Sequence, residues 1–278
     1  VRITQEIVLG IGGVRALRAM NIQPNGFIVA NHDNDLVRRA LIGVDRSIHW
    51  VGRSMEATYR LVSIQTRPAG ELEAKLLVNG QSVELISFLV GEHHAFNLVS
   101  AFAVANVLQL DRQIVLKSIT NFPGLKRRFE RYREDKILTI VDDYAHHPTE
   151  IAVTITAARQ RYPGRRILVV FQPHLSERTT DLFGEFVAAL TLADQTVIAP
   201  TYEPAGRIQI LHAKTSADLA VALNAVGTSA VAPVQDDVLA VVMQSLCIGD
   251  VVLTVGATVI WKIADELQSW KINGKVGS

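Results

Sequence analysis

The fold of this chain is decided by the stretch Ile137-Leu138-Thr139-Ile140-Val141-Asp142-Asp143-Tyr144-Ala145-His146-His147-Pro148-Thr149-Glu150. Its first five residues form a short apolar run, which is typical of a parallel strand covered on both faces. Pro148 suits the first position of a helix, and Glu150 suits the first turn, where a negative charge complements the helix dipole. The stretch therefore predicts a buried strand that becomes a helix at a cluster of ionisable side chains.

Strand-like and helical segments alternate from this stretch onward. We expect strands at 137–141, 167–171, 196–199 and 251–255, and helices at 149–161, 178–190, 216–225, 235–245 and 259–270. Such alternation indicates an α/β fold with a doubly wound, mostly parallel, Rossmann-like sheet. In sheets of this kind, ligands bind beyond the carboxyl ends of the strands.

The first part of the chain has a different pattern. We expect helices at 14–20 and 35–41, a strand at 26–30, antiparallel strands over 58–90 with a turn at Val78-Asn79-Gly80, and a long helix at 94–108. We place the boundary near Pro123-Gly124, which gives two domains, 1–122 and 123–278.

The composition disfavours several classes of protein. The chain has 278 residues, 49% of them hydrophobic, and a formal net charge of +1. This balance gives no reason to expect a nucleic-acid or membrane partner. The single cysteine cannot form an internal disulfide, and we expect no secretory leader or membrane span, so the cytoplasm is the expected compartment. The first residue is Val1, and we expect that an N-terminal part is missing.

Polar side chains follow each of the four expected strands. In chain order they are Asp142, Asp143, His146 and His147, then Gln172, His174 and Arg178, then Tyr202, Glu203 and Arg207, and last Gly256-Ala257-Thr258. Because the carboxyl ends of parallel strands meet at one edge of a sheet, we expect these residues to share one site. Loops are polar in most proteins, and each residue alone has that explanation as well. Four coincident strand ends favour a site.

Neither His146-His147 nor His93-His94 chelates a metal by itself, because neighbouring side chains on a strand or a helix diverge. We therefore assign no metal ligand and expect no zinc site. A hard cation held through a nucleotide, such as Mg²⁺, is favoured over zinc because it needs few protein ligands. Gly10-Ile11-Gly12-Gly13 has the glycines of a phosphate loop but lacks the rest of its pattern, so we expect no P-loop in this sequence.

Two further motifs have alternative explanations. Lys126-Arg127-Arg128-Phe129-Glu130-Arg131 is either a solvated charge run or, because it lies between the expected domains, the source of an arginine for a phosphate held there. Asn97 lies in the first turn of the expected long helix. Its amide suits an adenine edge, but equally a cap or a buried polar contact. The residues alone leave both questions open.

The order and spacing of these motifs resemble those of the Mur ligases. The segments that carry the resemblance are Gly91-Glu92-His93-His94-Ala95-Phe96-Asn97, Lys126 to Glu130, Asp142 to Glu150, Phe171-Gln172-Pro173-His174 with Arg178-Thr179, and Gly256-Ala257. The third and fourth segments are most similar to the branch of the family that joins L-alanine to UDP-N-acetylmuramate. The resemblance implies a partial central ATPase domain without its P-loop at 1–122 and a C-terminal Rossmann-like ligase domain at 123–278.

The resemblance implies an ATP-dependent amide ligation in peptidoglycan synthesis, and thus a role in cell-wall growth and cell division. The γ-phosphoryl group of ATP, bound with Mg²⁺, would activate the lactyl carboxylate of UDP-N-acetylmuramate, and L-alanine would displace phosphate. Asn97 would contact adenine, Arg128 or its neighbour Arg127 the phosphates, and Asp142 or Asp143 the ribose. Substrate carboxylates would face three residues that, with Arg128, form the expected catalytic set: His146, His174 and Arg178.

The sequence departs from the family pattern at three matched positions. His94 stands where the family has asparagine, Leu175 where an arginine follows Pro-His, and Thr258 where the family's Gly-Ala-Gly ends in glycine. The family's uridine-nucleotide domain and Gly-Lys-Thr loop have no counterpart in the 278 residues.

Three functions are therefore compatible with the sequence. The first is a C-terminal portion of a muramate–alanine ligase that is inactive alone. The second is a degenerate Mur-like binding or regulatory module, which keeps a nucleotide- or ligand-binding domain or pairs with a separate chain that supplies the missing N-terminal half. The third is the related ligase that attaches a recycled tripeptide to the same sugar nucleotide.

Overall fold

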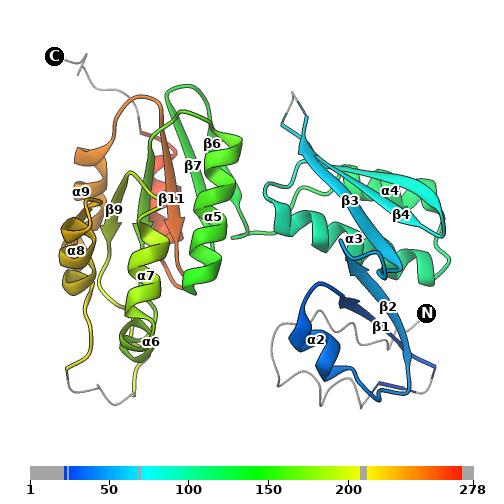
Figure 1. The fold of residues 1–278 in the computed structure, drawn as a ribbon. Coiled ribbons are helices and arrows are strands. Elements are labelled where there is room, and N and C mark those ends of the chain that lie inside the picture. The colour runs from blue at the N-terminus through cyan, green and yellow to red at the C-terminus, as the bar shows by residue number, and fades with distance from the viewer. Residues whose placement is uncertain (1–21, 24, 68–69, 207–211, 271–278) are drawn as a thin grey trace. The chain divides into compact units, whose positions relative to one another are not determined.

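A computed structural model of the chain describes residues 22–23, 25–67, 70–206 and 212–270 (Figure 1). The chain divides into two compact units, Val1–Pro123 and Gly124–Ser278. The helix expected at 14–20, the glycines at 10–13 and Arg207 lie outside the described residues.

The first unit contains a five-stranded mixed sheet in the order β1-β2-β3-β4-β5. The strands β1 (Phe27–Asn31), β2 (Ser47–Gly52) and β3 (Tyr59–Thr66) pair in parallel, and β4 (Leu72–Val78) pairs antiparallel with both β3 and β5 (Gln81–Ser87). The described helices of this unit are α2 (Asp35–Ala40), α3 (Glu92–Val107) and α4 (Arg112–Thr120). The core forms between the sheet and the apolar side chains of α3, among them Leu98, Val99, Phe102 and Ala103.

The expected turn at residues 78–80 joins β4 to β5. Asn79 has a φ of 49° and Gly80 a φ of 77°, so both residues lie in the left-handed region. A two-residue hairpin needs this geometry because it matches the twist of the strands, and Asn-Gly adopts it at the lowest cost. The turn is therefore confirmed as a hairpin.

The second unit contains a six-stranded sheet in the order β10-β9-β8-β11-β7-β6. The strands are β6 (Glu130–Glu134), β7 (Leu138–Asp143), β8 (Ile167–Phe171), β9 (Gln195–Ile198), β10 (Ser229–Val231) and β11 (Asp250–Val255). All neighbouring pairs are parallel except β6 with β7. The expected α/β, Rossmann-like sheet is confirmed, with one antiparallel strand at its edge.

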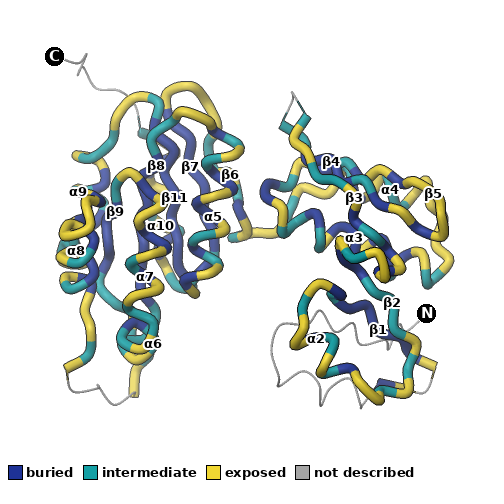
Figure 2. The backbone as a smooth tube through the Cα atoms, viewed as in Figure 1, coloured by how far each residue is buried: buried dark blue, intermediate teal, exposed yellow. Residues whose placement is uncertain are grey.

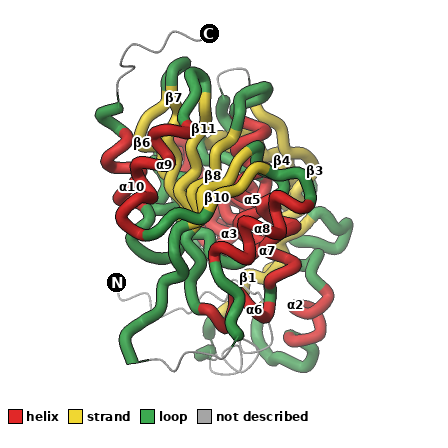
Figure 3. Tube along the Cα trace, turned by 90° about the vertical axis from the view of Figure 1, so that its left-hand side faces the viewer, coloured by secondary structure: helices red, strands yellow, loops and turns green. Residues whose placement is uncertain are grey.

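Helices cover both faces of this sheet (Figure 3). One face packs on α9 (Val238–Ser245) and α10 (Trp261–Leu267), through Val242 and Ala264. Connections over the other face include α5 (Pro148–Arg161) and α7 (Phe183–Leu190), and the ring of Phe186 lies 5.5 Å from that of Phe171. Because both faces are covered, β7, β8 and β11 are buried along their whole length (Figure 2). This burial explains their continuous apolar runs.

Several element boundaries differ from expectation. The helix expected at 178–190 is two helices, α6 (Ser176–Asp181) and α7, and 3₁₀ residues Gln235–Asp237 precede α9. The helix α8 (Ser216–Ala225) has the expected bounds. Four elements were not expected: β2, α4, β6 and β10. The sequence of β6 is Glu-Arg-Tyr-Arg-Glu, whose charges suit an edge strand and hide the apolar alternation on which the prediction depends.

The strand β7 is longer at its carboxyl end than expected. Asp142 and Asp143 belong to the strand, paired with Thr254 and Val255 of β11, and are not in the following loop. Acidic residues are depleted from strands, so their placement here is not visible in the sequence. It depends on partners far along the chain, which stabilise both carboxylates.

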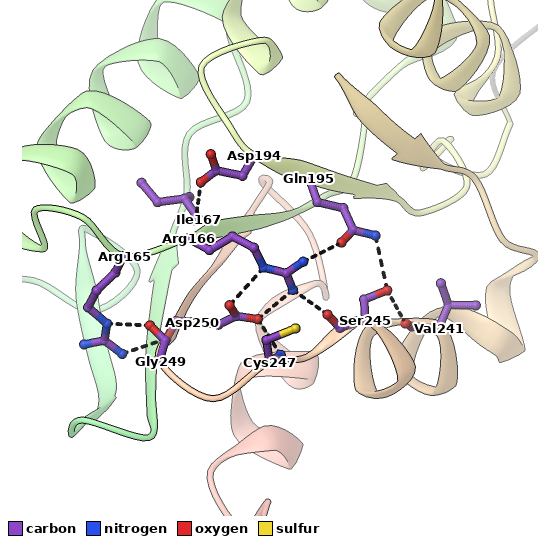
Figure 4. Close-up of polar contacts among 10 residues, drawn as sticks. All are labelled: Arg165, Arg166, Ile167, Asp194, Gln195, Val241, Ser245, Cys247, Gly249 and Asp250. Carbon is purple, nitrogen blue, oxygen red and sulfur yellow. Dashed lines mark hydrogen bonds and ion pairs between the residues drawn. The ribbon is translucent and has the colours of Figure 1, made fainter. Parts of the chain in front are cut away.

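The amino ends of the central strands are held by a buried ion pair (Figure 4). The Arg166 guanidinium donates from Nε to Asp250 Oδ1 over 3.0 Å and from Nη2 to Asp250 Oδ2 over 2.8 Å. Asp250 is 1% exposed and also accepts a hydrogen bond from the backbone N–H of Cys247. The pair therefore ties β8 to β11 and to the loop that precedes β11.

We expect Asp250→Ala to lower the free energy of unfolding of the second unit by about 3 kcal/mol, because Arg166 then keeps a half-buried charge without its partner. Arg131→Ala, which breaks the half-exposed pair between Arg131 and Glu134 at 3.0 Å, should cost about 0.5 kcal/mol. Urea unfolding of the full chain measures both. A loss for Asp250→Ala no larger than for the control would contradict this account.

Candidate functional site

The carboxyl ends of four strands meet at one edge of the sheet in the second unit. The last residue of β11, Val255, is in register with Asp143 of β7 and Phe171 of β8, and Phe171 is in register with Ile198 of β9. The loops that follow these strands therefore leave the sheet at the same level. We name this edge, with the residues of these four loops, the carboxyl edge.

An ion pair lies at the base of the carboxyl edge. Arg127 donates from Nε to Asp142 Oδ2 over 3.0 Å, from Nη1 to the carbonyl of Thr258 over 2.9 Å and from Nη2 to the carbonyl of Gly256 over 2.5 Å. The other oxygen of Asp142, Oδ1, accepts a 2.6 Å hydrogen bond from the hydroxyl of Thr254. The Asp142 side chain is fully buried, and Arg127 joins it to the loop after β11.

These contacts indicate a structural role for Arg127 and Asp142. Burial raises the pKa of the Asp142 carboxyl, while the hydrogen bonds from Thr254 and Arg127 oppose that rise. All three guanidinium nitrogens of Arg127 are occupied within the unit. For the phosphate contact, the geometry favours Arg128 over Arg127, and for the ribose contact it disfavours Asp142.

Asp143 points to the opposite face of β7 and lies nearer the surface, at 8% exposure. Its Oδ2 accepts a hydrogen bond from the backbone N–H of Phe129 and its Oδ1 from that of Ala145, both over 2.8 Å. Burial raises the pKa of Asp143 to about 6, against the lowering effect of these two bonds and of the Arg128 charge. Each carboxylate oxygen can still accept a further hydrogen bond.

Arg128 is exposed, and its side chain makes no hydrogen bond within the described part of the chain. The guanidinium lies over the ring of Tyr144, 5.4 Å from the ring centre, and that of Arg127 lies 5.1 Å from the same centre. Cation–π contacts of this kind orient a charge without neutralising it. Tyr144, which the sequence analysis did not single out, therefore links the basic run to the carboxyl edge.

The N-terminus of α5 is organised by Glu150. Its Oε2 accepts hydrogen bonds from the backbone N–H groups of His146, over 3.0 Å, and His147, over 3.2 Å, while the His147 side chain caps the helix. Partial burial raises the pKa of Glu150, but these bonds outweigh it and the net shift is downward. Glu150 is a structural residue, and His147 is occupied as the N-cap.

A row of rings runs along the carboxyl edge. The ring of His146 lies 5.3 Å from that of Tyr144 and 6.3 Å from that of His174, edge to face in both cases. His174 stacks on Tyr202, with ring centres 5.7 Å apart and planes 11° from parallel. The row thus joins the loops after β7, β8 and β9, three of the four loops in which the sequence predicts site residues.

Two contacts link the remaining members of the edge. The hydroxyl of Thr258 donates to Gln172 Oε1, and Gln172 Nε2 donates to the carbonyl of Pro200 over 3.3 Å. Gly256 has a φ of 154°, and a Cβ there would lie 3.0 Å from the Gln172 carbonyl. A glycine is therefore needed for this close approach.

Arg178 and Asn97 complete the expected set. Arg178 lies in α6 and is half-buried, and its Nη1 is buried without a hydrogen-bond partner among the described residues. Asn97 belongs to the first unit, where it is exposed in the second turn of α3, because that helix begins at Glu92 and not at His94. The structure brings together the expected residues of the second unit and describes Asn97 only within the first.

Sequence reasoning missed three residues of the edge: Tyr144, Thr254 and Glu130. Glu130 Oε2 accepts a 2.8 Å hydrogen bond from the backbone N–H of Arg127, which has a φ of 58°. Thr254 sits inside an apolar run, and only its register with Asp142 reveals its role. Tyr144 could have been found, since an aromatic residue between acidic and histidine residues is a recognisable signal.

The described residues contain no group of three or more His, Cys, Asp or Glu side chains that would hold a metal ion. Mg²⁺ that arrives with a nucleotide needs few protein ligands, so such a group is not required for it. In the same residues, no helix combines the length and the apolar character needed to cross a bilayer.

The fold is that of a doubly wound α/β domain, and its carboxyl edge carries Arg, Asp and His residues. Residues 127–258 match the family model described as Mur ligase, glutamate ligase domain. Through this domain the chain belongs to the Mur ligase family. The matched segment begins at Arg127 and ends at Thr258, two residues that are hydrogen-bonded to each other.

Relatives and solved structures agree with this family. The UDP-N-acetylmuramate–L-alanine ligase of Delftia acidovorans is 33% identical over 262 residues, which cover 88% of this chain and 54% of the relative. The structure of UDP-N-acetylmuramate-alanine ligase from Thermotoga maritima has a TM-score of 0.70 at 24% identity, over 89% of this chain and 59% of that one. MurF ligase from Thermotoga maritima in complex with ADP has a TM-score of 0.70 at 17% identity, over 94% and 61% of the chains. The chain spans about half the length of the curated relatives it matches.

The raised pKa of Asp143 predicts a pH-dependent stability. The folded state keeps the proton up to about pH 6, whereas the ordinary pKa is 3.8. The contribution of Asp143 to stability is therefore full below about pH 4 and is lost as the pH rises through about 6. We expect the difference in unfolding free energy, wild type minus Asp143→Asn, to fall by up to about 3 kcal/mol between pH 4 and pH 7.

Asp135→Asn is the matched control, because the backbone N–H of Leu138 lowers the pKa of Asp135 to about 2. The corresponding difference for this variant should have the opposite slope and decrease as the pH falls toward 2. Chemical unfolding at a series of pH values measures both. A difference for Asp143→Asn that does not change with pH would refute the raised pKa.

Proposed function

We propose that the chain is a portion of a ligase that joins L-alanine to UDP-N-acetylmuramate through an acyl phosphate, at the expense of ATP, in peptidoglycan synthesis. The observation that carries the proposal is the carboxyl edge, which combines an available guanidinium, a carboxylate near the surface and a row of imidazoles on one rigid sheet. The named activity of the 33% identical relative supports the choice of substrates. A cytoplasmic location, as in the sequence analysis, is part of the same proposal.

The nucleotide side of the edge consists of Arg128 and Asp143. Arg128 is exposed and oriented by Tyr144, so its charge is available to the phosphates of ATP. Asp143 is the better candidate for the ribose hydroxyls, because Asp142 is fully buried and paired with Arg127, whereas Asp143 keeps 8% exposure and its hydrogen bonds among the described residues come from backbone N–H groups. A contact of Asn97 with adenine remains part of the proposal and is supported by its exposure on α3. The ADP complex of a structural neighbour is consistent with a nucleotide ligand.

The substrate side consists of His146, His174 and Arg178. The buried Nη1 of Arg178 without a hydrogen-bond partner in the described residues calls for an acceptor, and a substrate carboxylate is a suitable one. The imidazoles of His146 and His174 lie within one row and can donate to the same acidic ligand. All three side chains are cationic or able to become so, which suits an acidic substrate.

The reaction consists of two transfers. A carboxylate oxygen attacks the γ-phosphorus of ATP, the bond to the β-phosphate oxygen breaks, and ADP leaves. The neutral amine of L-alanine then attacks the acyl carbon, phosphate leaves with the bonding electrons, and the amine loses a proton. Phosphorylation is needed because a carboxylate is a poor acyl donor, and the phosphate supplies the leaving group that the amine displaces. The contribution of the protein is positioning and charge neutralisation by Arg128 and Arg178.

The tripeptide-attaching ligase and the ligand-binding module are the alternatives. The two ligases differ only in the acceptor, which is L-alanine for one and a tripeptide for the other. The relatives named for L-alanine favour the first proposal. Comparing L-alanine with a tripeptide as acceptor, in a protein that holds this domain with its preceding domains, separates the two ligases. A module without ligase activity would bind nucleotide but accept neither.

The two arginines of the basic run should respond differently to substitution. Arg127→Met leaves the buried Asp142 and two carbonyls without their donor, so the free energy of unfolding should fall by about 3 kcal/mol. Arg128→Met removes an exposed charge, so stability should change by less than about 0.5 kcal/mol, while ATP binding weakens about tenfold. Thermal unfolding and calorimetric titration with ATP measure the two effects. Unchanged ATP affinity in Arg128→Met would exclude it from the phosphate site.

The chain alone should not turn over. The 278 residues contain no Gly-Lys-Ser or Gly-Lys-Thr, the loop that cradles nucleotide phosphates in ATPases of this kind. Incubation with ATP, Mg²⁺, L-alanine and UDP-N-acetylmuramate is expected to release no phosphate above the rate without protein. Steady release that depends on L-alanine would show that the chain needs no such loop.

A further inference from the structure

The loop between β8 and α6 has a backbone geometry that needs support from outside. Leu175 has a φ of 71°, in the left-handed region that a branched side chain adopts only at a cost. The same residue is the N-cap of α6, and it makes no side-chain cap hydrogen bond. A six-residue helix that begins in this way is not stable by itself. Contacts from another segment must therefore hold the loop, which carries His174 and Arg178.

Tyr202 supplies the first set of contacts. Its backbone N–H donates to the carbonyl of Pro173 over 2.9 Å, and its carbonyl accepts from the N–H of Leu175 over 3.0 Å. The two bonds enclose His174, which forms a parallel bridge with Tyr202. The ring of Tyr202 then stacks on the imidazole at 5.7 Å, so backbone and side chain act on the same residue.

Glu203 supplies the second set. Its Oε1 accepts hydrogen bonds from both the backbone N–H and the hydroxyl of Ser176, the first residue of α6. This carboxylate takes the place of the side-chain cap that Leu175 cannot provide, and its charge suits the helix N-terminus. Arg178 lies two residues further along the same turn. The direction of its guanidinium, with the buried Nη1, therefore depends on a helix that Glu203 holds.

The segment that carries Tyr202 and Glu203 is itself fixed to the sheet. The buried Ser216 donates from Oγ to the carbonyl of Ala199 over 2.7 Å, and the Gln172 side chain donates to the carbonyl of Pro200 over 3.3 Å. The N–H of Ala199 continues the strand pairing with the Phe171 carbonyl over 2.8 Å. The positions of Tyr202 and Glu203 are thus determined by β8, β9 and the start of α8.

We propose that Tyr202 and Glu203 are positioning residues of the ligase site: they hold His174 and Arg178 in the geometry that receives the acidic substrate. The inference deepens the proposed function and rests on it for the identity of the ligand. It adds two residues that touch neither the reacting atoms nor the nucleotide. The loop contains a strained residue, Leu175, and the helix after it has no cap of its own, so the loop keeps one conformation only while the contacts from Tyr202 and Glu203 are present.

The stack on His174 is tested by NMR on the full chain. In the wild type, the ring current of Tyr202 should move the His174 ring protons upfield, and His174→Gln assigns the signal. Tyr202→Phe keeps the ring and should keep this shift, whereas Tyr202→Leu should lose it and broaden the backbone signals of Leu175 and Ser176. A His174 signal that is unchanged in Tyr202→Leu would overturn the role of Tyr202.

The effect on ligand is measured by calorimetric titration with UDP-N-acetylmuramate and, separately, with ADP, in a protein that holds this domain with its preceding domains. Tyr202→Leu and Glu203→Ala should each weaken binding of the sugar nucleotide about tenfold and leave binding of ADP unchanged. Glu203→Gln retains an acceptor oxygen and should lose less than Glu203→Ala. Equal affinity in wild type, Tyr202→Leu and Glu203→Ala would overturn the positioning proposal.

The two proposals fail in distinguishable ways. If the wild type does not bind the sugar nucleotide, the proposed function fails, and the NMR shifts of His174 still decide whether Tyr202 positions it. If the wild type and the variants bind the sugar nucleotide equally well, the proposed function is retained and the positioning roles of Tyr202 and Glu203 are refuted. Weaker binding that comes with a lost His174 shift supports both.

Discussion

The ion pair between Arg127 and Asp142 determines the positions of the loops at the carboxyl edge. A carboxylate with no exposed surface is unfavourable unless its charge is compensated, and here Arg127 and Thr254 together satisfy both oxygens. Because Arg127 also donates to the carbonyls of Gly256 and Thr258, compensating one charge fixes the loop after β11. That loop in turn contacts Gln172 through Thr258, and the end of β8 is held as well.

The same arrangement recurs along the carboxyl edge. Each candidate functional side chain is held by a neighbouring residue that has no proposed contact with the ligand. Tyr144 orients Arg128, Glu150 holds the backbone of His146, and Tyr202 and Glu203 hold the loop of His174 and Arg178. At the opposite end of the strands, the pair of Arg166 with Asp250 closes the amino edge. A sheet tied at both ends supports its loops, which the proposed ligation, a reaction that depends on positioning, would require.

Much of the architecture could be predicted from particular segments. The run 167–171 and the helix 216–225 have the bounds that the pattern predicts, because apolar runs and capping residues are local signals. The strand β6 and the split of 178–190 into α6 and α7 could not be predicted. The first is charged and owes its conformation to β7, and the second breaks at Leu182, which carries no breaking signal.

The sequence by itself determined the α/β class, the strands β7, β8, β9 and β11 and the residue types that follow their carboxyl ends, because these depend on short-range periodicity and on the direction of parallel strands. Only the tertiary structure decided which of two neighbouring residues is paired inside the unit and which keeps exposed surface. Arg127 and Arg128, or Asp142 and Asp143, are chemically alike in the sequence. The two aspartates lie in β7, where successive side chains point to opposite faces, and the two arginines lie before β6, where Arg127 has a φ of 58°. Arg127 and Asp142 pair with each other and support the fold, while Arg128 is exposed and Asp143 keeps 8% exposure, on which the proposed ligand contacts depend.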